Sequence, residues 1–102
     1  MKVNHGFHAT MTARPGKGDE LVEFLLNAPS LPNADCVVFL VGRSAGNPDV
    51  VTVTEGWTSP EAHATFFGSE AAQTFVASLQ PLLAGESHYT DEVPVGGKAT
   101  LR

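Results

Sequence analysis

The most constraining feature of this sequence is a strand-like run that passes into a helix start within three residues. Val50 to Trp57 alternates apolar and polar side chains and ends at the chain's only tryptophan. Ser59 and Pro60 follow, a pair typical of a helix N-cap and first helical position. Trp57 therefore stands at a strand-to-helix corner, where its indole is a natural wall for a flat aromatic ligand.

Hydrophobic periodicity predicts the other elements. Alternation indicates strands, apolar residues at helical spacing indicate helices, and turn residues between Ser44 and Asp49 indicate a hairpin. Pro81 is expected to kink or end the last helix near Gln80. The expected order is strand 3–14, helix 19–28, strand 36–41, strand 50–57, helices 60–67 and 70–80, and strand 88–93.

This order predicts an α+β chain with a ferredoxin-like split βαβ arrangement, in which an antiparallel sheet carries helices on one face. We expect residues 1–93 to form a single domain and residues 94–102 to form a loose C-terminal tail. The second sheet face would be solvated or covered by another subunit, which would close a barrel. The polar residues expected on that face are Thr10, Thr12, Thr52 and Thr54.

Composition excludes several classes of partner. The net charge is −5 and the six Lys and Arg residues are scattered, which argues against nucleic-acid binding. No apolar run approaches the ~20 residues that span a bilayer, so no membrane partner is expected. The first six residues lack the apolar core of a signal peptide, and we expect a cytoplasmic protein. Cys36 is the only cysteine, which excludes an internal disulfide and a cysteine metal cage.

Several short blocks, in order from Val3 to Val93, carry a resemblance to a known family. They are Pro15-Gly16-Lys17, Asn47-Pro48-Asp49, Glu55-Gly56-Trp57, Ser59-Pro60-Glu61-Ala62 and Leu79-Gln80-Pro81-Leu82-Leu83. With these blocks the chain resembles the antibiotic biosynthesis monooxygenase (ABM) domains, which include quinol monooxygenases and lie in the dimeric α+β barrel superfamily. The resemblance implies a homodimer and cofactor-free oxidation of a quinol or hydroxylated aromatic substrate by molecular oxygen.

Such chemistry needs a pocket that binds the substrate, removes a proton and excludes water. We expect His8 or His63 to be the catalytic acid-base group. The substrate-binding residues expected are Trp57, Phe66, Phe67, Phe75, Leu40 and Tyr89. Many family members carry a histidine at about the position of Phe66, and the haem-degrading branch depends on one there. A phenylalanine cannot ligate iron, so haem degradation is not expected.

Each of these residues also has a purely structural interpretation. Trp57 and the phenylalanines are equally suited to a hydrophobic core, and His8 to a polar position on a subunit face. His5 and His8 are three apart on a strand and point to opposite faces, so no metal site is predicted. Glu55 is either a buried carboxylate of the pocket or a rim residue paired with Arg43 across the hairpin, and we expect the ion pair.

Two other functions are compatible with the same sequence. The chain could be a non-catalytic dimeric protein of the same superfamily that binds an aromatic ligand or takes part in a stress response. It could also be a cofactor-free isomerase or cyclase, because fold alone does not choose among chemistries.

Overall fold

Four antiparallel strands form the sheet that organises the chain: β1 (His5–Thr12), β2 (Cys36–Arg43), β3 (Val50–Trp57) and β4 (His88–Glu92). The computed structural model describes residues 2–98. The strand order across the sheet is β2-β3-β1-β4, and each neighbouring pair is antiparallel. This is the ferredoxin-like α+β fold that the sequence predicts, so the expected fold class is confirmed.

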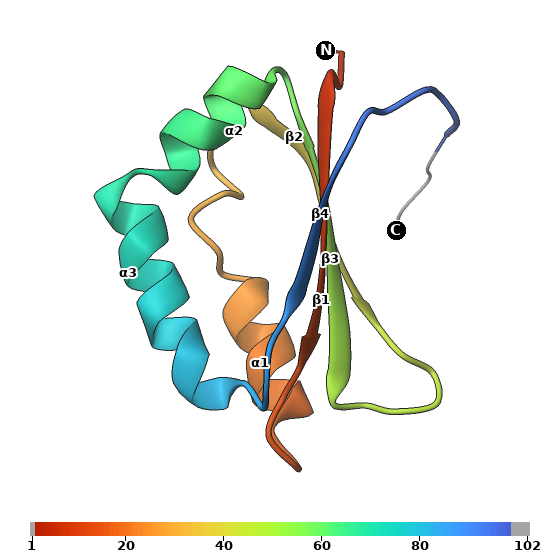
Figure 1. Ribbon diagram of the computed structural model, residues 1–102, viewed down its shortest axis with the longest axis vertical. Coiled ribbons are helices and arrows are strands. Elements are labelled where there is room, and N and C mark those ends of the chain that lie inside the picture. Colours follow the sequence, from red (N-terminus) through yellow and green to blue (C-terminus); the bar gives the residue numbers. More distant parts are fainter. Residues whose placement is uncertain (1, 99–102) are drawn as a thin grey trace.

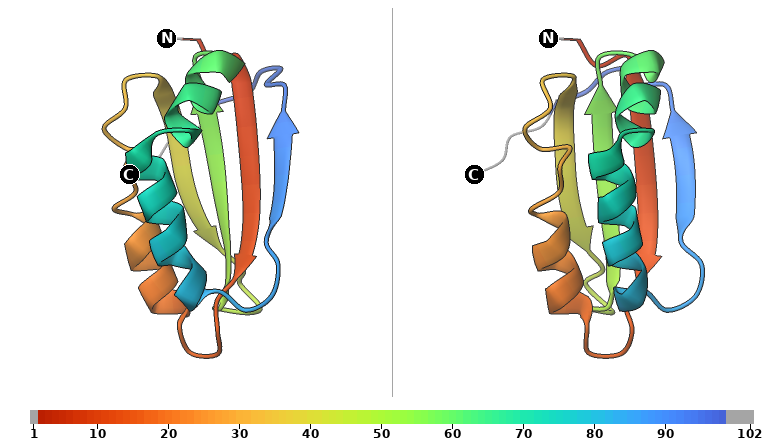
Figure 2. Two further views of the ribbon diagram at one scale, coloured as in Figure 1. Left: turned by 60° about the vertical axis from the view of Figure 1, so that its left-hand side comes forward. Right: turned by 90° about the vertical axis from the view of Figure 1, so that its left-hand side faces the viewer.

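The helices all lie on one side of the sheet (Figure 1). They are α1 (Gly18–Leu25), α2 (Pro60–Phe67), α3 (Glu70–Leu79) and a short 3-10 helix η1 (Gln80–Leu82). Figure 2 shows α2 and α3 running along the sheet in front of the strands, with α1 beside α3. The opposite face of the sheet carries no helix among residues 2–98.

Serine caps decide where α2 and α3 begin. The hydroxyl of Ser59 accepts a hydrogen bond from the backbone N–H of Ala62 at 3.0 Å, and that of Ser69 accepts one from Ala72 at 3.2 Å. Pro60 occupies the first helical position of α2. Both expected caps are confirmed, and α3 ends at Leu79 as the nearby proline predicts.

Alternation along the strands separates a buried face from an open one. Ala9, Met11, Val51 and Val53 face the helices and form the core together with Leu21, Leu25, Leu79 and Leu83. The residues between them point the other way, and His8 bonds Thr54 there, with 3.1 Å between His8 Nδ1 and the threonine hydroxyl. The core is therefore a single layer between the sheet and the helices, as the pattern predicts.

The tip of the β2–β3 hairpin is bound to the start of α1. The carboxylate of Asp49 accepts hydrogen bonds from the backbone N–H groups of Gly16 and Gly18 at 3.2 and 3.0 Å. Gly18 is buried here, and a Cβ at this position would collide with the carbonyl oxygen of Pro48. The Gly16-Lys17-Gly18 segment is thus a turn that lets the helix approach the hairpin closely.

We expect Gly18→Ala to destabilise the fold by about 1–3 kcal/mol, because the new methyl group meets a backbone carbonyl that cannot move aside. Urea unfolding of wild type and variant measures the difference. Gly46→Ala is the matched control, since a Cβ there meets nothing within 4 Å, and its effect should stay within about 0.5 kcal/mol. Equal stability of the two variants would contradict the close approach.

The C-terminal segment follows β4 without forming another element. Residues 94–98 are neither helical nor in a strand, and residues 99–102 of the expected tail lie outside the described residues. Within residues 2–98, no helix has both the length and the apolar character needed to cross a membrane.

Candidate active site

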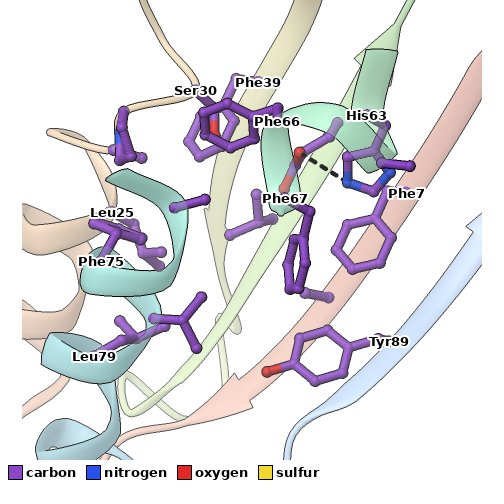
Figure 3. Close-up of a pocket in the computed structure, with 18 of the residues that line it drawn as sticks. Phe7, Leu25, Ser30, Phe39, His63, Phe66, Phe67, Phe75, Leu79 and Tyr89 are labelled. Atoms are coloured by element: carbon purple, nitrogen blue, oxygen red, sulfur yellow. Dashed lines mark ion pairs between the residues drawn. The ribbon is translucent and has the colours of Figure 1, made fainter. Parts of the chain in front are cut away.

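A cavity of about 950 Å³ lies between the helix-facing side of the sheet and the helices. Its walls are mostly apolar, and Figure 3 shows aromatic rings reaching it from both the strands and the helices. Six aromatic side chains line it: Phe7, Phe39, Phe66, Phe67, Phe75 and Tyr89. A space with these walls suits a planar, mostly apolar ligand.

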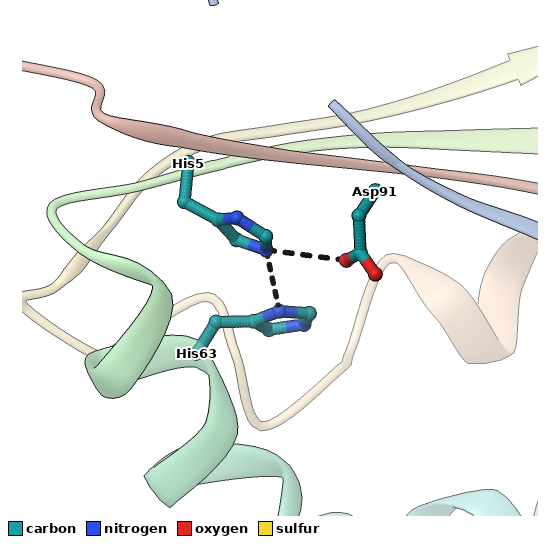
Figure 4. A group of neighbouring side chains, drawn as sticks. All are labelled: His5, His63 and Asp91. Atoms are coloured by element: carbon teal, nitrogen blue, oxygen red, sulfur yellow. Dashed lines mark hydrogen bonds and ion pairs between the residues drawn. The ribbon is translucent and has the colours of Figure 1, made fainter. Parts of the chain in front are cut away.

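Four titratable side chains meet at one corner of this cavity: His5, Glu55, His63 and Asp91. His5 Nε2 lies 3.1 Å from His63 Nδ1 and 3.3 Å from a carboxylate oxygen of Asp91 (Figure 4). His63 Nε2 lies 4.0 Å from a carboxylate oxygen of Glu55 (Figure 3). We refer to these four residues as the polar corner.

Strand register explains how residues so far apart in sequence meet. Phe7 of β1 pairs with Glu55 of β3 on one side and with Asp91 of β4 on the other. His5 lies two residues before Phe7 and therefore on the same sheet face. His63 reaches this face from α2, with its ring centroid 4.9 Å from that of Phe7 and 5.0 Å from that of His5.

Trp57 supports the polar corner from behind and does not line the cavity. Its side chain is fully buried, and its indole N–H donates a hydrogen bond to Glu55 Oε1 at 2.8 Å. The indole packs against His63 and Phe66, with ring centroids 5.1 and 5.2 Å apart. Trp57 therefore holds a buried carboxylate and two cavity residues in place.

The hydrogen-bond partners of His5 and His63 indicate which ring nitrogen of each imidazole carries a hydrogen. A carboxylate only accepts, so His5 Nε2 carries a hydrogen that faces both Asp91 and His63 Nδ1. His63 Nδ1 therefore carries no hydrogen and accepts from His5, and the neutral ring carries its hydrogen on Nε2, on the side of Glu55. The accepting atom in the polar corner is His63 Nδ1.

Burial shifts the protonation of the groups in and near the polar corner. Burial raises the pKa of Glu55, while the hydrogen bond from Trp57 acts in the opposite direction. Burial, and next the neighbouring His5, lower the pKa of His63, which keeps its imidazole neutral at neutral pH. Burial also raises the pKa of Cys36 to about 11, so this thiol stays protonated.

The structure brings some of the predicted site residues together and separates others. His63, Phe66, Phe67, Phe75 and Tyr89 all line the cavity. His8 and Leu40 do not, and strand alternation places both on the opposite face of the sheet.

Residues that the sequence did not single out for the pocket also line it, among them His5, Ser30 and Asp91. Glu55, for which a place in the pocket was the alternative to the ion pair, lines it as well. Ser30 is the one buried polar residue among residues 2–98, with 6% of its surface exposed. A signal for His5 existed, since it continues the inward register of Phe7.

The expected ion pair between Glu55 and Arg43 is wrong. Arg43 Nη2 instead pairs with Asp19 at 2.8 Å, and Phe39 is the residue opposite Glu55 in the hairpin. The register of the hairpin places Arg43 opposite Val51, four residues from Glu55, so the two charged side chains are not cross-strand neighbours.

The donor atoms of the polar corner are also close enough to hold an ion. The ligating atoms of His5, His63 and Asp91 all lie within 4.8 Å of one another. No other group of three such residues was found within the described part of the chain.

The model of the family "Antibiotic biosynthesis monooxygenase" matches residues 5–78. The chain belongs to this family. A solved protein from Chloroflexus aurantiacus J-10-fl, described as a candidate antibiotic biosynthesis monooxygenase, is 36% identical to this ABM chain. The match covers 93% of this chain and 96% of that protein, with a TM-score of 0.75. The resemblance seen in the sequence is thereby confirmed.

More distant structures share the fold of this ABM chain. A Caulobacter crescentus CB15 protein is 22% identical over 93% of this chain and 92% of its own, with a TM-score of 0.81. A Mycobacterium tuberculosis protein is 18% identical over 93% of this chain and 98% of its own, with a TM-score of 0.75. No curated protein matches the sequence.

We expect Trp57→Phe to cost about 1.5–3 kcal/mol of unfolding free energy, because the Glu55 carboxylate loses its indole donor while most of the ring volume remains. Urea unfolding at pH 7 measures the loss. Glu55→Gln is the matched variant: its amide oxygen still accepts from the indole, so a smaller loss is expected. A change below about 0.5 kcal/mol in Trp57→Phe would show that the bond contributes little.

Proposed function

We propose that this ABM protein is a cofactor-independent monooxygenase that oxidises a quinol or hydroxylated aromatic substrate with molecular oxygen. The observation that carries the proposal is an aromatic-walled cavity with a neutral histidine in its one cluster of titratable groups. Its volume of about 950 Å³ lies within the ~300–1,000 Å³ common for small-molecule sites. The family assignment and the Chloroflexus relative support the same activity.

The cavity suggests how the substrate is oriented. A planar ring fits between the aromatic walls, with a hydroxyl group directed at His63 in the polar corner. The hydroxyl of Ser30, another residue of the cavity lining, offers a second polar contact away from His63 (Figure 3). A substrate with oxygen atoms at two positions on its ring system, such as a quinol, would use both contacts.

The proposed reaction begins when the His5 Nε2–H turns fully toward Asp91 and frees the lone pair of His63 Nδ1, which then takes the proton of the substrate hydroxyl. The carboxylate of Asp91, whose oxygen lies within 4.8 Å of His63 Nδ1, stabilises the added charge. The resulting electron-rich anion transfers an electron to oxygen, and the two radicals combine at a ring carbon. The peroxide formed on that carbon takes back the proton from His63. Its O–O bond then breaks as the hydrogen on the same carbon is lost, so that one oxygen atom stays on the ring as a carbonyl, the other leaves as water, and the product is a quinone. The substrate supplies all of the electrons, and the apolar walls limit side reactions with water.

Oxygen uptake with a panel of quinols and anthrones tests the proposal. We expect His63→Ala to lower kcat by about 10²–10⁴-fold, because the group that takes up the substrate proton is lost. His88→Ala is the control, since this exposed histidine lies on β4 outside the cavity lining, and its rate should match wild type. His8→Ala examines the other histidine predicted from the sequence. An unchanged rate in a folded His63→Ala variant would contradict the proposed role of His63.

The same assay separates the alternative functions. Tight binding of an aromatic probe without oxygen uptake would favour the non-catalytic ligand-binding protein. Conversion of a substrate without oxygen uptake would favour an isomerase or cyclase.

We also propose that the protein works as a homodimer in the cytoplasm, with a second copy covering the open face of the sheet. Leu40, Thr52 and Thr54 of this face line a shallow hollow. The hollow continues around the edge strand β2 to Phe39, Val41 and Leu26, the last of which is 52% exposed. A sheet face that carries leucine and threonine side chains and no helix is well suited to pair with its own copy.

We expect Leu40→Asp to convert the dimer to a monomer, because a like charge from each copy would enter an apolar contact. Light scattering coupled to size exclusion should show the mass of the particle fall from two chains to one. Leu31→Asp is the control, since this exposed leucine lies in the segment after α1, away from the sheet. A wild-type protein that is monomeric at assay concentration would contradict the dimer.

A further inference from the structure

The polar corner contains a donor set that proton transfer alone does not require. Two imidazoles and one carboxylate converge from β1, α2 and β4, and their ligating atoms lie within 4.8 Å of one another. We propose that His5, His63 and Asp91 bind a divalent transition-metal ion, through His5 Nε2, His63 Nδ1 and a carboxylate oxygen of Asp91, with the His5 hydrogen moving from Nε2 to Nδ1. No metal site was predicted from the sequence, because His5 and His8, the two histidines close together in it, point to opposite faces of the strand.

The distances suit a first-row metal ion. Metal–nitrogen bonds to histidine are about 2.0–2.1 Å, so two nitrogens 3.1 Å apart would subtend about 100° at a shared ion. The Asp91 oxygen lies 3.3 Å from His5 Nε2, which gives a similar angle. The Asp91 side chain is 74% exposed and can turn to complete the set, whereas His5 and His63 are 13% and 12% exposed and held by their surroundings.

A second carboxylate is placed to orient one of the ligands. When a histidine binds a metal through one nitrogen, the other N–H commonly faces a carboxylate, which fixes the ring and raises its basicity. His63 Nε2 faces Glu55 at 4.0 Å, and Glu55 is itself held by the hydrogen bond from Trp57. At 4.0 Å the two atoms are too far apart for a hydrogen bond, so Glu55 is an electrostatic partner of the His63 ring in the position of an outer-shell carboxylate.

The donor chemistry restricts the ion. Imidazole nitrogen suits zinc, iron, cobalt, nickel and copper, whereas calcium and magnesium prefer oxygen ligands throughout. Three protein ligands leave at least one coordination position free for water or another small ligand. The cavity that adjoins the polar corner has room for that ligand.

Metal binding and the proposed base use the same lone pair. An ion on His63 Nδ1 would prevent that atom from taking the substrate proton, so the metal is expected to inhibit oxygen uptake and a chelator to restore it. This consequence rests on the proposed function, whereas metal binding itself does not.

Titration of the tag-free protein with Zn²⁺ and with Co²⁺, each without substrate, tests the proposal. Calorimetry should show one saturable site per chain, and bound Co²⁺ should acquire visible absorption from its nitrogen and oxygen ligands. His5→Ala and Asp91→Ala should each weaken binding by more than about 100-fold, since loss of an outer-shell partner alone costs about 10–100-fold. Glu55→Gln should weaken metal binding by the smaller factor of about 10–100-fold.

His88→Ala is the matched control and should bind as wild type, because His88 is an exposed histidine outside this group. Asp91→Ala keeps the test valid if a histidine variant fails to fold, because Asp91 is exposed and its loss leaves the core untouched. Absence of saturable binding in wild type, or undiminished affinity in Asp91→Ala, would overturn the site. Either result would leave the oxygen-uptake assay of His63→Ala unaffected.

Discussion

The antiparallel register that holds β1 between β3 and β4 determines where three of the four polar-corner residues lie, His5, Glu55 and Asp91. Because Phe7 pairs with both Glu55 and Asp91, two carboxylates from strands far apart in the sequence flank one aromatic ring. A slip of one residue in either pairing would turn a carboxylate to the open face of the sheet. The buried alternation of Ala9, Met11 and their neighbours opposes such a slip, so packing of the core also positions the chemistry.

Most of the fold was predictable because its signals are local. Alternation in β3, the serines before α2 and α3, and the hairpin turn all act over a few residues, and each is present in the structure. The site was less accessible to sequence reasoning, because it depends on which face of β1 the helices cover. His5 and His8 both lie on this strand, and only the inward register of Phe7 and Ala9 separates them.

Two further features of the site could not be predicted from local patterns. Asp91 lies on a strand whose side chains are all exposed, so no hydrophobic signal marks it as part of a pocket. The direction of the Trp57 indole depends on contacts with α2, which turn it behind the cavity wall and toward Glu55. Both are consequences of tertiary packing between elements that are distant in sequence.

The edge position of β4 has a consequence for how this site can change. Its five residues are all exposed, yet Tyr89 and Asp91 line the cavity. Side chains on an exposed edge strand can be exchanged with little effect on the core, whereas His63 or Glu55 cannot be altered without disturbing buried neighbours. Substitutions on this edge strand can therefore change the cavity wall at Tyr89 and the charge beside His5 while the core stays intact.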